Sequence, residues 1–145
     1  MRFELVDQVV ELSAEQGRIV TVKNVSSAEE YLQDHFPTFP VLPGVLMIES
    51  LVQAARRLLT AIDPACSRHV LGGVRALKYG NMVRPGESLR VEVTLEKRGE
   101  QGKFDFKGVG TVLRPGSSAS SDGTGEVAAA AVNGRFSLRP LVIRG

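Results

Sequence analysis

Two titratable side chains, His35 and Glu49, stand 14 positions apart in the segment HFPTFPVLPGVLMIE (35–49). Three prolines, one glycine and almost no polar residues lie between them. A histidine titrates near neutral pH, and a carboxyl group among apolar side chains keeps its proton more readily than one in water. The segment could therefore supply both a general base and a general acid. On residue types alone, a solvated Glu49 and a purely structural loop role for His35 stay open.

The same segment leads into a predicted helix that begins after Pro43-Gly44. The first amide groups of a helix have no acceptor within it, and they carry the positive end of its dipole. Gly44 has no side chain to block approach, so its amide could hold a carbonyl oxygen that becomes negative. A base, an acid and an oxyanion donor together suit proton removal next to a carbonyl, with loss or gain of a nearby hydroxyl group.

The rest of the chain must position these groups. Residues 45–62 contain no Pro or Gly and are apolar around most of the helix circumference, which predicts one long buried helix. Runs rich in β-branched and aromatic residues, separated by turn residues, predict strands. They cover 3–12, 18–25, 69–83, 87–99, 103–114 and 125–143, and Asn133-Gly134 is a candidate break in the last one. This order predicts an α+β domain with an antiparallel sheet packed on a single helix.

Composition limits the function classes. The chain has 145 residues, which suits one domain over 1–145, and the low-complexity stretch 117–125 is expected to be a flexible loop. One cysteine and two histidines form no recognised metal-ligand set, so no metal is expected. There is no phosphate-binding loop, and the net charge of +2 is no argument for nucleic acid. Charges in the first apolar run do not fit a signal peptide, and no apolar run is long enough to span a membrane, so a cytoplasmic protein is expected.

The central segment resembles the H-F-P-x-x-P-x-x-P-G-V-L-x-x-E-x-x-x-Q signature of the FabZ/FabA-type 3-hydroxyacyl-[acyl-carrier-protein] dehydratases. The matching positions are His35, Pro37, Pro40, Pro43, Gly44, Glu49 and Gln53. LVDQVVEL (5–12), KNV (23–25) and GGVRALKYGNMVRPGESLRVEV (72–93) are also similar to family segments. The resemblance covers about residues 4–114.

This resemblance implies the hot-dog fold and a homodimer that can assemble further into a trimer of dimers, with sites at the dimer interface. It implies that His35 takes the α-proton of a 3-hydroxyacyl thioester and that Glu49 of the partner subunit protonates the departing hydroxyl. The Gly44 amide would hold the thioester oxygen, Gln53 would orient Glu49, and Val41 would help to bind substrate. The product would be a trans-2-enoyl thioester on an acyl-carrier protein, without a cofactor. A glutamate at the acid position points to the branch that only dehydrates.

Two alternatives on the same fold stay open. One is a thioesterase, for which an acid on the helix would suffice and His35 would be dispensable. The other is a non-catalytic subunit that binds acyl groups or an acyl-carrier protein.

Overall fold

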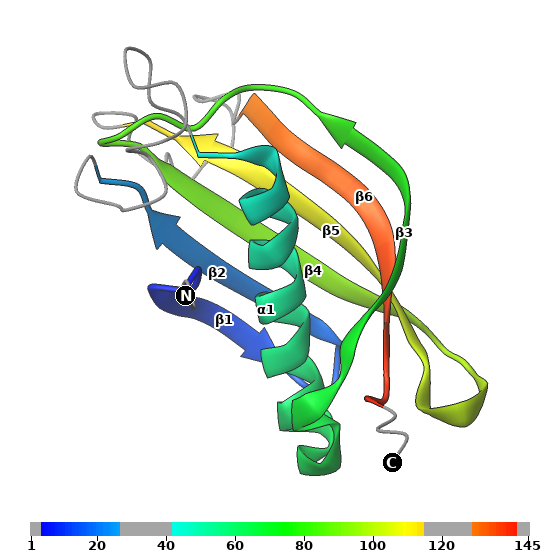
Figure 1. The fold of residues 1–145 in the computed structure, drawn as a ribbon. Coiled ribbons are helices and arrows are strands. Elements are labelled where there is room, and N and C mark those ends of the chain that lie inside the picture. Colours follow the sequence, from blue (N-terminus) through cyan, green and yellow to red (C-terminus); the bar gives the residue numbers. More distant parts are fainter. Residues whose placement is uncertain (1–3, 27–41, 115–128, 142–145) are drawn as a thin grey trace.

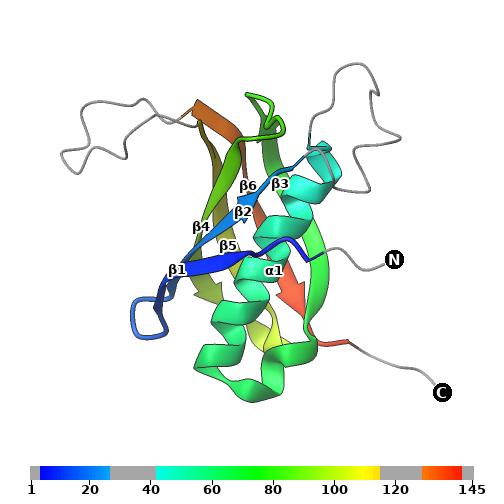
Figure 2. The ribbon, with the colours of Figure 1, turned by 90° about the vertical axis from the view of Figure 1, so that its left-hand side faces the viewer.

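A single long helix, α1 (Gly44–Ile62), crosses one face of a six-stranded sheet in the computed structural model (Figure 1). The structure describes residues 4–26, 42–114 and 129–141. The view turned by 90° shows the strands curving around α1 (Figure 2). The predicted α+β hot-dog fold, one long central helix wrapped by an antiparallel sheet, is therefore confirmed.

The sheet runs in the order β1-β2-β4-β5-β6-β3, and every neighbouring pair is antiparallel. The edge strands β1 and β3 therefore come from distant parts of the sequence. The strands are β1 (Gln8–Ser13), β2 (Arg18–Asn24), β3 (Val70–Tyr79), β4 (Ser88–Arg98), β5 (Phe104–Leu113) and β6 (Ala129–Arg139). Two short 3-10 helices, η2 (Pro64–Arg68) and η3 (Glu100–Gly102), follow α1 and β4.

The ends of α1 follow from its flanking residues. Pro43 is the N-cap residue in an extended conformation, and no side chain caps this end. The helix stops at Asp63 because Pro64, which follows it, disfavours the helical conformation there. The Asp63 carboxylate accepts a hydrogen bond of 3.0 Å from the Ala65 amide and so caps η2 instead.

The core forms between α1 and the concave face of the sheet. Two glycines of β5 leave room for neighbouring side chains. A Cβ on Gly108 would lie 3.1 Å from Cδ1 of Leu51 in α1. A Cβ on Gly110 would lie 2.8 Å from Cγ1 of Val132 in β6. The Gly-Val-Gly of β5 is thus a packing feature. The buried residues of α1 are Met47, Ser50, Leu51, Val52, Ala54, Ala55, Leu58 and Leu59.

Two predicted strand limits differ from the structure. β1 begins only at Gln8, because residues 4–7 run along α1 before they reach the sheet. β6 runs through Asn133-Gly134 without a break, since Asn133 pairs with Val109 and Gly134 with Gly108 of β5. Backbone hydrogen bonds from β6 to β3 and β5 outweigh the turn preference of an Asn-Gly pair. Residues 117–125, predicted to be a loop, lie outside the described residues.

A charge cluster on the outer face of the sheet sets a pH dependence. Arg18 contacts Glu11 at 2.6 Å and Glu92 at 3.1 Å, and the hydrogen bond from Arg18 is the main cause of a pKa of Glu92 below its ordinary value of 4.5. A carboxyl group with a lowered folded-state pKa stabilises the fold above its ordinary pKa, and this stabilisation is lost as the pH falls toward the folded value.

Glu92→Gln is therefore expected to lower the free energy of unfolding at pH 7 and to flatten its decrease in acid. The effect is about 1 kcal/mol or less, because both side chains are partly exposed. Urea unfolding of both proteins between pH 7 and pH 3 measures this. An equal difference between them at every pH would contradict the assignment to Glu92.

Candidate active site

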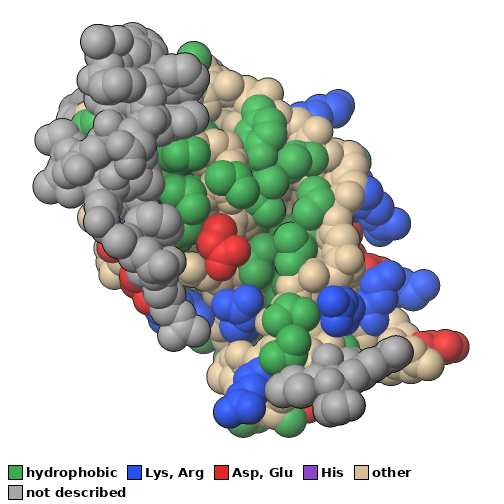
Figure 3. All heavy atoms as spheres, in the orientation of Figure 1, with side chains coloured by type: hydrophobic (Ala, Val, Ile, Leu, Met, Phe, Trp, Pro, Cys, Tyr) green, Lys and Arg blue, Asp and Glu red, His purple; other side chains and the backbone are tan. Residues whose placement is uncertain are grey.

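The outward stripe of α1 carries the predicted acid. Val45, Glu49, Gln53 and Arg57 follow one another at intervals of four and so share one side of the helix. Val45 is 69% exposed, whereas Glu49 and Gln53 are half-buried. Hydrophobic side chains gather over the N-terminal half of α1, and Lys and Arg lie over its C-terminal half (Figure 3). The predicted acid thus lies in the more apolar part of this surface.

Backbone hydrogen bonds fix the chain just before α1 and the first turn of the helix. The amide of Leu42 donates to the Val83 carbonyl at 2.8 Å, which ties the chain before the helix to the chain after β3. The amides of Leu46 and Met47 donate to the Pro43 carbonyl at 3.0 and 3.2 Å. The Gly44 amide precedes these donors, so helix geometry leaves it without an acceptor in α1. Its location suits the predicted oxyanion donor.

Tyr79, the last residue of β3, lies against Gly44. A Cβ on Gly44 would lie 2.8 Å from Cε1 and 2.9 Å from Cζ of the Tyr79 ring, so a larger residue at this position would require the ring to move. Partial burial raises the pKa of Tyr79. Sequence reasoning gave Tyr79 no role, and no local pattern could have placed it beside the helix start.

Gln53 joins Glu49 to the N-terminal segment. Its Nε2 donates to Oε1 of Glu49 over 3.4 Å, and its Oε1 accepts a hydrogen bond of 2.9 Å from the Leu5 amide. The predicted contact between Gln53 and Glu49 therefore exists in the structure. Glu49 is half-buried in the single chain and not enclosed. Its suitability as an acid thus depends on what covers this face of α1.

The other predicted site residues, His35 and Val41, lie outside the described residues. Of the five predicted site residues, the structure places three, Gly44, Glu49 and Gln53, along the first half of α1.

Two further reactive side chains have structural roles. His69 is buried, and its Nε2 lies 2.8 Å from the Gly102 carbonyl oxygen. Cys66 is buried as well, and burial raises the pKa of its thiol. Neither residue is placed to act as a nucleophile.

Among the described residues, no cluster of acidic, histidine or cysteine side chains could hold a metal ion, and no helix has the length and apolar character of a membrane span.

Comparison with known proteins assigns the family. Residues 1–113 match the FabA-like domain. The chain belongs to the FabA-like family. The family predicted from the sequence is thus confirmed.

Three curated relatives of the chain are described as 3-hydroxyacyl-[acyl-carrier-protein] dehydratases. A 3-hydroxyacyl-[acyl-carrier-protein] dehydratase FabZ of Oenococcus oeni is 45% identical over 94 residues, 64% of this chain and 67% of that protein. The FabZ of Bacillus cytotoxicus is 43% identical over 112 residues, 76% of each chain. A third FabZ, from Lactobacillus helveticus, is 44% identical, and the matched region is 62% of its length. The FabA-like chain thus matches about two thirds to three quarters of the length of these relatives.

Solved structures support the fold. The dehydratase heterocomplex ApeI:P from Xenorhabdus doucetiae aligns with a TM-score of 0.63 at 16% identity, over 91% of this chain and 96% of that one. A hypothetical thioesterase from Streptococcus pneumoniae with coenzyme A aligns with a TM-score of 0.62 at 10% identity, over 95% and 88%. At these identities the similarity shows that the FabA-like chain shares their fold, and function must come from the site.

Proposed function

We propose that this FabA-like protein is a 3-hydroxyacyl-[acyl-carrier-protein] dehydratase that forms trans-2-enoyl thioesters in fatty-acid or related lipid biosynthesis. The observation that carries the proposal is the uncapped helix start at Gly44 with the Glu49–Gln53 pair on the exposed side of the same helix. Homology to FabZ dehydratases supplies the reaction class.

In the proposed reaction, His35 takes the proton from C2 of the substrate. The electron pair of that C–H bond forms the C2=C3 double bond, and the bond from C3 to its hydroxyl oxygen breaks. Glu49 gives its proton to the departing hydroxyl, which leaves as water. The Gly44 amide holds the thioester oxygen, on which negative charge develops as C2 loses its proton. Transfer of a proton from His35 to Glu49 would restore the starting state.

The site is proposed to form between two copies of the chain, with His35 facing Glu49 of the partner subunit. Two features of a single chain support this. β3 pairs only with β6 among the described strands, and nearly all of its residues are exposed, Leu71 and Val74 included. Val45, just before the acid on the same helix face, is also exposed and apolar. A second chain over this edge would cover these side chains and enclose Glu49.

An acyl-carrier protein is the proposed partner, and carrier proteins are acidic. Of the basic residues considered from the sequence, Arg56 donates to the His69 carbonyl at 3.0 Å. Arg57 pairs with Glu4. Both guanidinium groups thus already have partners within the chain. Lys78 lies with Lys107 and Arg135 around a hollow on the outer face of the sheet, and it is the better candidate for a carrier contact. Arg84 is exposed but also interacts within the chain, so it ranks with Arg56 and Arg57. The cytoplasmic location stays a prediction.

The direct test supplies a 3-hydroxyacyl carrier protein and follows enoyl formation by ultraviolet absorbance, with a thiol reagent in a parallel sample. The proposal predicts enoyl product without free thiol. Free thiol without enoyl product would support the thioesterase alternative, which is favoured only by the shared fold. Carrier binding without either product would support the non-catalytic alternative.

A further inference from the structure

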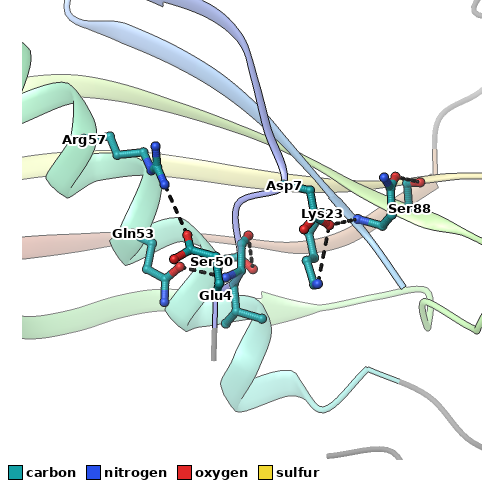
Figure 4. Close-up of polar contacts among 9 residues, drawn as sticks. Glu4, Asp7, Lys23, Ser50, Gln53, Arg57 and Ser88 are labelled. Atoms are coloured by element: carbon teal, nitrogen blue, oxygen red, sulfur yellow. Dashed lines mark hydrogen bonds and ion pairs between the residues drawn. The ribbon is translucent and has the colours of Figure 1, made fainter. Parts of the chain in front are cut away.

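The N-terminal segment of residues 4–7, called the latch below, runs beside α1 before β1 begins. The Leu5 amide donates to Oε1 of Gln53 at 2.9 Å. One residue earlier, the Glu4 carboxylate pairs with Arg57 at 3.1 Å. Figure 4 shows these contacts side by side, one turn apart on the same helix. The latch therefore meets α1 on the stripe that also carries Glu49.

The other end of the latch is anchored on the sheet. Asp7 lies 3.4 Å from Nζ of Lys23, a side chain that is only 7% exposed, and Asp7 Oδ2 accepts a hydrogen bond of 2.7 Å from the Asn24 amide. Between the anchors, Leu5 is fully buried and Val6 nearly so. An ion pair with a buried lysine is costly to break. The position of the Leu5 amide is thus set by packing and by charges at both ends.

This position decides which way the Gln53 amide points. The Leu5 N–H is a donor, so the side chain must turn its oxygen toward it, and its NH₂ group then faces the Glu49 carboxyl. The reverse orientation would set two donors against each other at Leu5 and two oxygens against each other at Glu49. Both ends of the amide therefore favour the same orientation.

We propose that the Leu5 main-chain amide is a positioning group for the dehydration, and this inference rests on the proposed function. Gln53, held by Leu5, donates to Oε1 of Glu49. Because an oxygen that accepts this bond keeps its lone pair, the acid proton of Glu49 is placed on Oε2. The departing hydroxyl group is then protonated from Oε2.

The test removes the amide hydrogen with Leu5→Pro and measures kcat, KM and thermal stability. We expect kcat to fall by up to about 10-fold, the upper end of the effect of losing one hydrogen bond between neutral groups, while KM changes less than about 2-fold. In a Gln53→Leu background, Leu5→Pro should leave kcat unchanged. Val6→Ala is the matched control, because it loses buried volume beside Leu5 and should lower stability but not kcat. An equal fall of kcat in both backgrounds, or with Val6→Ala, would overturn the inference.

Two further measurements test the inference if Leu5→Pro does not fold or if the protein does not dehydrate the substrate. Gln53→Glu keeps an acceptor for Leu5 but no donor for Glu49, so it should fold normally and lose at least as much kcat as Leu5→Pro; an unchanged kcat overturns the inference. If the wild type shows no turnover, NMR of the Gln53 side-chain NH₂ group decides separately. Slow hydrogen exchange in the wild type that is lost in Leu5→Pro supports the latch, and equal exchange in both overturns it.

Discussion

His35→Ala and Glu49→Gln are each expected to lower kcat/KM for dehydration at least about 100-fold, because each removes one partner of a general acid–base pair. Mixing the two inactive chains is expected to restore activity. In a mixed dimer one site contains both substitutions, and the other combines an intact His35 with an intact Glu49 of the partner subunit. Random association should recover about a quarter of the wild-type rate, since half of the dimers are mixed and each has one working site.

The measurement is the enoyl-formation rate of chains that are unfolded, mixed and refolded together, since a stable dimer exchanges slowly. Each variant refolded alone is the control and should stay inactive. Activity of the mixture no greater than that of the separate variants would place each site within one chain. Glu49→Gln is chosen because it keeps the size of the side chain, so a loss of stability should not accompany the loss of rate.

Gly44→Ala is expected to lower the rate with little change in stability. In an open helix start, alanine would stabilise the chain by about 1 kcal/mol relative to glycine. Here its methyl group would lie 2.8 Å from the ring of Tyr79, a side chain that is 52% exposed and can move aside, so the contact offsets the helix preference without a large net loss. The same methyl group would lie next to the proposed oxyanion donor, and we expect a fall of about 100-fold in kcat.

Tyr79→Ala separates the effect of Gly44→Ala on stability from its effect on kcat. Thermal unfolding should show that Gly44→Ala stabilises the protein by about 1 kcal/mol with Tyr79→Ala and by less with Tyr79 present. Tyr79→Phe should give no relief, because the contact is with ring atoms. The loss of rate should persist with Tyr79→Ala, since the methyl group still blocks the approach to the amide. The same change of stability in both backgrounds would contradict the Tyr79 contact.

Much of the fold could be predicted because its signals are local. The helix of 45–62 was expected from an apolar run without Pro or Gly, and it forms over Gly44–Ile62. The alternating strand of 87–99 appears as β4 for the same reason. The same local reasoning was wrong at Asn133-Gly134, where pairing with two neighbouring strands outweighs a turn preference. It also could not explain the glycines of β5, whose role is set by side chains of α1 and β6.

The sequence by itself determined which residue types the site has and on which element most of them lie. The spacing from Gly44 to Gln53 places the acid and its neighbour on one face of a helix that the local composition already favours. Only the tertiary structure decided what these groups touch. The Leu5 amide and Gln53 are 48 residues apart, and Tyr79 reaches Gly44 from the end of an edge strand. Such contacts depend on strand order, register and packing, which no local pattern of residues contains.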